Sequence, residues 1–258
     1  MLAFQGLLKK DFGISKFWFL LWLIFLAVFL LIPFALEIYY HMPLKILPVA
    51  VLMLIGFHAF FLPAMLLSML RLEGKTQLWL YNPQNSKALF LSKMAVCSIY
   101  QLIAQVFLTG VGLIIYQFYK NHIYIEAADL FMGITVFNVG LLLFGLYVSC
   151  WAIFYWTVYH SLGKFPAVKN WRWLVLLLLF FVFNTITALL AKIEFLKEIV
   201  NKWKIPILMN VNGDYKREGW EIYLNSTDIP VVGLVIYVIV AFSLFLISCW
   251  LLDRKVEV

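Results

Sequence analysis

Few side chains in this sequence stand at spacings that could do catalytic chemistry. Gly74–Lys75–Thr76 looks like the end of a phosphate-binding loop, but that motif needs a glycine five residues earlier, where the chain has Met69. The histidines form neither an H-E-x-x-H motif nor a pair four residues apart. They are His41, His58, His122 and His160. We therefore predict no catalytic residues, no metal site and no nucleotide or other cofactor site in the chain.

Polar side chains inside long apolar stretches could instead contact a transported molecule. His58 lies within one stretch, Gln101 and Gln105 share a helix face in another, and Asn184, Thr185 and Thr187 lie in a third. Polar groups at that depth usually face protein or water. Hydrogen bonds between helices are the favoured interpretation, and a mildly polar translocation surface is the alternative. The stretches contain no Asp, Glu, Lys or Arg, which argues against ion-coupled transport.

The elements that must position these residues are apolar spans. Hydrophobic residues make up 65% of the 258 and charged residues 13%, against roughly 25% charged in soluble domains. All the charges lie outside six stretches, and a bilayer core takes about 20 apolar residues in a helix. The stretches are about 17–36, 46–70, 94–119, 130–159, 173–191 and 231–252. We predict an all-α polytopic membrane protein with six transmembrane helices in one domain, 1–258.

The basic residues predict how the chain is oriented in a membrane. With the N-terminus in the cytoplasm, twelve Lys and Arg flank the spans inside, whereas the two short outer loops carry only Lys45 and Lys120. We therefore predict a multi-pass protein of the plasma membrane with both termini cytoplasmic. The net charge of +7 reflects this asymmetry rather than a nucleic-acid surface.

Three segments outside the spans have a recognisable character. Residues 1–16 mix apolar and charged side chains as in an amphipathic helix on the inner membrane surface, and Gly13 allows a break before the first span. Leu70–Tyr81 predicts a second amphipathic helix on the cytoplasmic side. The extracellular segment 192–228 predicts a short helix and then a hairpin turning around Asn212–Gly213.

This layout resembles the membrane-spanning permease subunits of ABC-2 type exporters. The resemblance rests on the amphipathic lead, six spans, the inner loop with Glu73–Lys75 and Leu78–Trp79–Leu80, and the large outer segment between spans five and six. Leu78 to Pro83 looks like the end of that family's coupling helix and the turn into span three. The predicted hairpin departs from the family, which often has short re-entrant helices there.

The resemblance implies partners and a set of functional residues. It implies separate ATPase subunits that hold ATP and Mg²⁺, a second copy or sister permease, and contact with membrane lipid; no nucleic acid is implied. Residues that would couple to the ATPase are Glu73, Lys75, Gln77, Leu78 and Trp79. The translocation path, which in the family is lined by spans two and five, would include Phe57, His58, Phe61, Asn184 and Thr187.

The predicted function is therefore that of a transporter subunit rather than an enzyme. The uncharged, aromatic spans favour a hydrophobic or amphipathic cargo, such as an antimicrobial or signalling peptide or a lipophilic drug, exported at the expense of ATP. Two alternatives are a membrane-embedded enzyme and a sensor or scaffold that binds an extracellular ligand through residues 192–228. An enzyme would need converging acids, bases or metal ligands, which the sequence does not offer at recognisable spacing.

Overall fold

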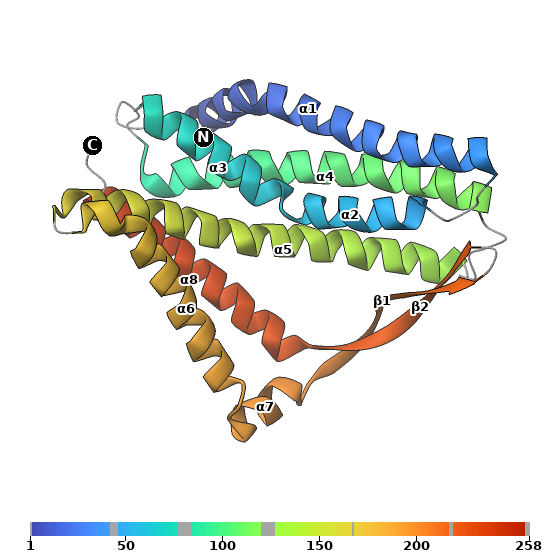
Figure 1. Ribbon diagram of the computed structural model, residues 1–258. Helices are drawn as coiled ribbons and strands as arrows, with labels where there is room; N and C mark the ends of the chain where they lie inside the picture. The colour runs from blue at the N-terminus through green and yellow to red at the C-terminus, as the bar shows by residue number, and fades with distance from the viewer. Residues whose placement is uncertain are drawn as a thin grey trace.

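The computed structural model of the chain describes residues 2–41, 46–76, 84–119, 127–166, 168–216 and 219–255. Its elements are α1 (Leu2–Tyr40), α2 (Leu47–Ala59), α3 (Phe61–Thr76), α4 (Ser86–Tyr119), α5 (Ala127–Ser161), α6 (Arg172–Leu190), α7 (Glu194–Asn201), β1 (Lys204–Lys216), β2 (Gly219–Pro230) and α8 (Val231–Lys255). Figure 1 shows α1 to α5 running side by side, whereas α6 and α8 diverge from them. Helices α3, α5 and α8 all finish at the same end of the molecule, which we call the "termini end".

The long helices fit a membrane protein. Helices α1, α4, α5, α6 and α8 are each long and apolar enough to cross a membrane, and the bent pair α2–α3 adds a sixth candidate if it counts as one span, within the described residues. The prediction of a mainly helical chain with long apolar helices that could span a membrane is thereby confirmed, and the six-span topology stays a prediction. The second predicted span, 46–70, coincides with the bent pair, and the other five each coincide with one long helix.

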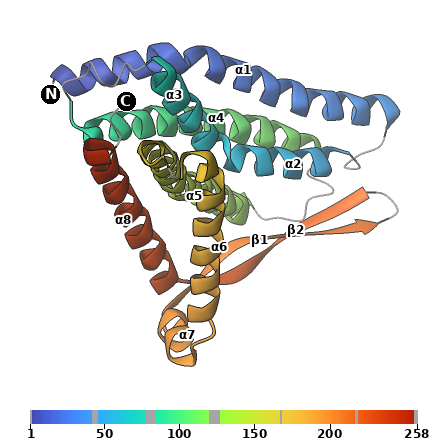
Figure 2. The same cartoon turned by 60° about the vertical axis from the view of Figure 1, so that its left-hand side comes forward.

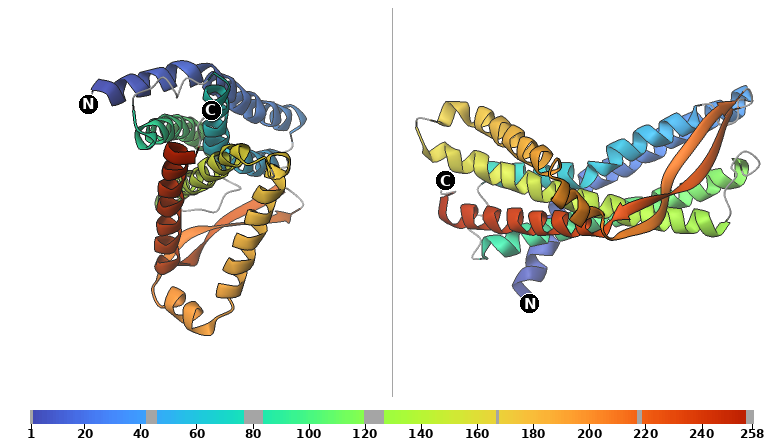
Figure 3. Two further views of the ribbon diagram at one scale, coloured as in Figure 1. Left: turned by 90° about the vertical axis from the view of Figure 1, so that its left-hand side faces the viewer. Right: turned by 90° about the horizontal axis from the view of Figure 1, so that it is seen from below.

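The first helix differs from its prediction. Instead of a separate lead over residues 1–16, α1 is one helix from Leu2 to Tyr40. A glycine inside a helix costs about 1 kcal/mol relative to alanine, so Gly13 weakens the helix without ending it. Leu7, Asp11 and Ser15, spaced four apart, are all buried against the bundle, and this packing carries the helix through. Its first turns point away from the direction of the remainder (Figure 3, right).

The second stretch bends by 41° where α2 gives way to α3. Pro63 has no N–H to offer the carbonyl of Ala59, so the regular hydrogen-bond ladder is interrupted at this turn. The N–H of Phe60 instead donates to the carbonyl of Phe57 over 3.2 Å. At the other end of α2, the Glu37 carboxylate accepts the N–H groups of Ile46 and Leu47 at 2.6 and 2.7 Å and so caps the helix from α1.

The core lies between α1, α3, α4 and α5. Leu26, Leu62, Val96 and Ile153, one from each of these helices, are completely enclosed. Gly145 of α5 permits the close approach of α3, because a Cβ there would stand 3.3 Å from the Cβ of Leu62. The core therefore fixes α3, the helix that leads into residues 77–83, against three neighbours.

Helices α6 and α8 spread away from this core and are connected at their far ends by α7 and the hairpin (Figures 1 and 2). No side chain of α6 is buried. The hairpin runs back from α7 and packs on α5, so that α5, the α6–α8 pair and the hairpin enclose a triangle in Figure 1.

The hairpin turns later than the sequence predicts. Asn212 and Gly213 lie within β1, opposite Tyr223 and Ile222, and the reversal comes between Lys216 and Gly219. The base of the hairpin is closed by a 3.0 Å hydrogen bond from the N–H of Val231 to the carbonyl of Trp203. Because the two arms leave this closed base together, the reversal falls near the midpoint of the segment rather than at the Asn-Gly pair.

Candidate functional site

An ion cluster lies in the bundle near the end of α3. The Lys93 ammonium of α4 is 2.8 Å from Glu73 Oε2 on α3 and 3.2 Å from Asp11 Oδ1 on α1. Lys10, beside Asp11 on α1, contacts Glu73 Oε1 from the other side. Ser92 Oγ donates to Asp11 Oδ2 at 2.7 Å. Two cations and two carboxylates thus join α1, α3 and α4.

Burial makes this ion cluster depend on all its members. The side chains of Lys93 and Asp11 are 1% exposed and that of Glu73 is 6% exposed, whereas Lys10 is 31% exposed. A buried ion loses its hydration at a cost of several kcal/mol, and a close partner of opposite charge offsets that cost only while it stays in place. The charges balance within the cluster, so a movement of one helix must be followed by the others or leave a buried charge unpaired.

Helical spacing positions each member. Asp11 shares its face of α1 with Leu7 and Ser15, and Ser15 Oγ donates to the Asp11 carbonyl at 2.6 Å. Glu73 follows Met69 on the buried face of α3, and Lys93 occupies the corresponding face of α4. These are charged residues on stripes that are otherwise apolar. The sequence predicts amphipathic helices outside the spans for Asp11 and Glu73, with Glu73 among the ATPase contacts, whereas in the structure these side chains and Lys93 lie on buried helix faces.

A small cavity connects the ion cluster to α5 and α8. It has a volume of about 10 Å³ and is lined by Glu73, Lys93, Trp156 of α5 and Leu252 of α8, among others. The indole Nε1 of Trp156 is buried and has no hydrogen-bond partner in the described residues. Gly74 keeps this contact close, because a Cβ there would stand 3.4 Å from Trp156 Cζ2. Helices from both halves of the chain therefore meet at the end of α3.

The predicted coupling residues lie in different environments, and three of them fall outside the described residues. Glu73 faces the bundle interior rather than an open surface, whereas Lys75 is exposed at the last turn of α3. Gln77, Leu78 and Trp79 lie outside the described residues. Residues 70–76 of the predicted amphipathic helix belong to α3, which begins at Phe61, and are thus a continuation of the span.

The predicted path residues divide into two groups. His58 and Phe61 are buried and stack on each other with ring centroids 5.8 Å apart, while the neighbouring Phe57 is exposed. Asn184 and Thr187 are exposed on α6, which packs chiefly on α5, and each donates to a carbonyl of its own helix. The two groups therefore come from different sides of the chain and do not form one surface within it.

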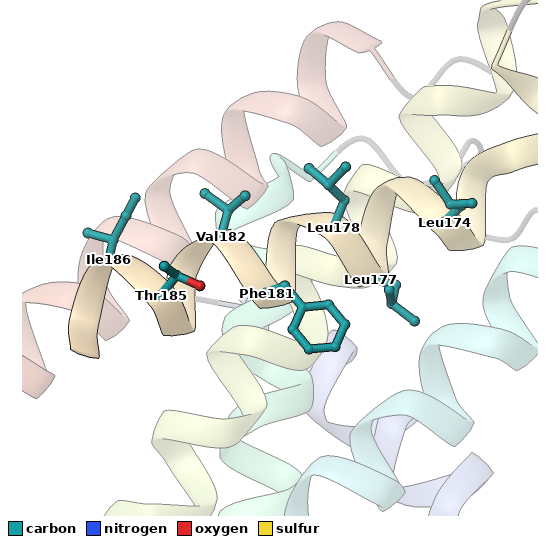
Figure 4. A pocket seen from close by; sticks show the side chains of 7 residues that line it. All are labelled: Leu174, Leu177, Leu178, Phe181, Val182, Thr185 and Ile186. Carbon is teal, nitrogen blue, oxygen red and sulfur yellow. The ribbon is translucent and has the colours of Figure 1, made fainter. Parts of the chain in front are cut away.

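Exposed apolar side chains mark one face of α6. Thr185 and six apolar residues line an open hollow there, at the three- and four-residue spacing of a helix face (Figure 4). The apolar residues are Leu174, Leu177, Leu178, Phe181, Val182 and Ile186. This α6 face has no protein side chains packed over it in the described chain, so lipid or another protein must cover it.

Interhelical hydrogen bonding accounts for one of the two glutamines in the third stretch. Gln105 Nε2 donates to the carbonyl of Asn138 on α5 at 3.0 Å, as the favoured interpretation predicts. Gln101, one turn earlier, is fully buried and its amide has no hydrogen-bond partner among the described residues. No group of three or more His, Cys, Asp or Glu side chains in the described ranges is arranged to hold a metal ion.

Comparison with known proteins relates the whole chain to one protein. No protein-family model matches it, and no solved structure matches it significantly. It is 32% identical over 260 residues to the uncharacterized protein YhcE of Bacillus subtilis (strain 168), and the match covers 100% of both chains. The chain belongs to the YhcE family. The YhcE match extends from end to end and so includes every helix and strand described above.

Proposed function

We propose that the chain is the permease subunit of an ATP-driven exporter of the ABC-2 type. A separate ATPase, holding ATP and Mg²⁺, binds at residues 77–83 between α3 and α4, and two permeases together move a hydrophobic or amphipathic molecule out across the plasma membrane. We call residues 77–83 the docking segment. The observation that carries this proposal is the ion cluster, because it connects the end of α3, just before the docking segment, to α1 and α4.

The ion cluster supports a way to transmit force. Glu73 lies three residues before the end of α3 and Lys93 seven residues after the start of α4, so both stand close to the segment that the ATPase would move. A displacement of 77–83 shifts the last turn of α3, and the Glu73 carboxylate carries Lys10 and Lys93 with it. The first and third spans then move as one unit with the ATPase contact.

The α6 face supports a second copy or a sister permease as a partner. Its apolar side chains are exposed (Figure 4), and Asn184 and Thr187 are exposed on other sides of the same helix. Amide and hydroxyl groups on a spanning helix usually face protein or water rather than lipid. A pathway between two permeases lined by α6 would put both polar groups to use.

The proposed orientation follows the basic residues. The termini end is cytoplasmic, which puts the exposed Arg71 and Lys75 of α3 on the cytoplasmic side with Lys87. The hairpin and α7 are then extracellular, between spans five and six. The six-span topology treats α2–α3 as one broken span.

The test is purification in mild detergent with identification of the proteins that come with the chain. The wild type should bring an ATPase that contains a G-x-x-x-x-G-K-[ST] loop. The variant Leu78→Asp/Trp79→Asp should lose it. The control Trp203→Asp/Ile205→Asp makes the same kind of change at two exposed positions, one just before β1 and one within it, and should retain it. An ATPase that is absent from the wild type, or equally present in both variants, contradicts the proposal.

A further inference from the structure

Unpartnered polar atoms gather beside the bend between α2 and α3. His58 of α2 is completely enclosed, and neither ring nitrogen has a hydrogen-bond partner within the part of the chain that the structure describes. The indole Nε1 of Trp22, on α1, is likewise buried without a partner there. The two rings stack with their centroids 6.3 Å apart. A buried polar group left unpaired costs about 1–3 kcal/mol, so a ligand that pairs with the indole N–H and one imidazole nitrogen would remove part of that cost.

The bend makes this location suitable for binding. Pro63 interrupts the hydrogen-bond ladder one turn after His58, and broken helices at membrane depth mark binding sites in many transporters. Trp22 is 6 residues from Lys16 and 15 from Glu37, the flanking charged residues on α1, which correspond to about 9 and 22 Å of helix. The polar atoms therefore lie within the apolar stretch that separates these two charged residues.

Aromatic rings line the way to these atoms from the surface. Phe61 stacks against both Trp22 and His58, with centroids 5.0 and 5.8 Å apart. Phe25 packs on Trp22 at 5.3 Å and meets Phe57 edge-on at 6.4 Å. Phe25 and Phe57 are 39% and 55% exposed on the outside of the bundle. Phe25 and Phe57 thus separate the enclosed polar atoms from the outer surface of the bundle, and a ligand that comes from the bilayer would have to pass between these two rings.

The chemistry of the atoms selects the ligand. An indole N–H only donates, whereas a neutral imidazole has one nitrogen that donates and one that accepts. A hydroxyl group can accept from the indole and donate to the imidazole at once. A carboxylate or ammonium head would need a counter-ion at the site, whereas Lys16, the charged residue of α1 nearest to Trp22, is exposed and about 9 Å away along the helix. We infer that Trp22 and His58 bind the hydroxyl group of an uncharged long-chain alcohol that enters from the bilayer past Phe57.

This alcohol site can be tested whether or not the chain pairs with an ATPase. The full chain in lipid vesicles is exposed to hexadecan-1-ol carrying a photoreactive diazirine near the hydroxyl, and labelled residues are mapped by mass spectrometry. The methyl ether of the same probe has equal length but no hydroxyl hydrogen to donate. The alcohol should label α1 and α2 around Trp22 and His58 about tenfold more than the ether does, since one hydrogen bond in an apolar site is lost.

Two variants and a matched control decide the assignment. His58→Phe and Trp22→Phe keep a ring and remove the polar atoms, so each should reduce labelling by the alcohol about tenfold. Trp156→Phe makes the same indole-to-phenyl change at the other unpartnered indole, beside the ion cluster, and should label like the wild type. If His58→Phe fails to fold, the comparison of Trp22→Phe with Trp156→Phe stands by itself. Equal labelling by alcohol and ether, or full labelling of Trp22→Phe, means contact with bulk lipid or a trapped water only and overturns the inference.

Discussion

Replacing Lys93 with methionine tests whether the ion cluster holds three helices together. Methionine approximates the aliphatic part of the lysine side chain but leaves Asp11 and Glu73 buried with Lys10 as their remaining cation, and Lys10 is 31% exposed. Lys93 stands 2.8 and 3.2 Å from the two carboxylates, so its loss breaks two close ion pairs. Removing one partner of a buried ion pair costs about 3–5 kcal/mol, and we expect Lys93→Met to lower the free energy of unfolding by that amount.

The assay is unfolding of the purified chain in mixed micelles of rising dodecyl sulfate fraction, followed by tryptophan fluorescence. Lys87→Met is the control, because Lys87 is an exposed lysine on the same helix and should change the free energy of unfolding by less than about 0.5 kcal/mol. The double variant Glu73→Gln/Lys93→Met should be more stable than Lys93→Met alone, because one carboxylate instead of two then remains to be balanced by Lys10. A loss from Lys93→Met no greater than that from Lys87→Met would refute the reasoning.

Two further predictions concern helix contacts. Glu37→Ala leaves two N–H groups at the start of α2 without their carboxylate acceptor and should cost about 1–2 kcal/mol, seen as faster hydrogen exchange at the first turn of α2, whereas Glu37→Gln keeps an oxygen acceptor and should exchange more slowly than Glu37→Ala. Gly145→Val forces α5 away from Leu62 and should lower the free energy of unfolding by about 1–3 kcal/mol. Gly112→Ala, on a helix position with nothing within 4 Å of the new Cβ, should be neutral or stabilising, and equal effects at the two glycines would contradict the packing argument.

The apolar spans could be predicted from the sequence because a membrane imposes one strong rule. Charges are excluded from about 20 consecutive residues, and each stretch found in this way corresponds to a long helix or to α2–α3. Pro63 accompanies the bend, because proline removes a hydrogen bond from the helix ladder. Pro33 lies inside the continuous helix α1, however, so a proline in the sequence does not by itself predict where a span breaks.

The start of the first helix and the turn of the hairpin could not be predicted in the same way. Gly13 allows a break in isolation, yet packing of Leu7 and Asp11 on α4 keeps α1 continuous. The Asn212–Gly213 pair favours a turn in isolation, yet closure of the hairpin base moves the reversal beyond Lys216. In both cases contacts between distant segments outweighed a preference of about 1 kcal/mol.

The ion cluster was missed because its members are far apart in the sequence. Asp11, Glu73 and Lys93 lie at the edges of the spans, where charged residues are ordinary, so their residue types alone do not distinguish them from solvated residues. The signal lies in periodicity, since Lys93 follows Leu89 and Phe90 on the buried face of α4. A charged residue that continues an apolar stripe therefore predicts a residue of opposite charge on the facing stripe of another helix.

The proposed ATPase contact can be measured most directly by crosslinking in living cells. A photoreactive phenylalanine derivative is placed at position 79, in the docking segment, and in a second variant at the exposed position 203. The account predicts that position 79 captures a protein with an ATP-binding G-x-x-x-x-G-K-[ST] loop and that position 203 does not. Capture of such a protein from both positions, or from neither, would contradict the assignment of the chain as a permease driven through residues 77–83.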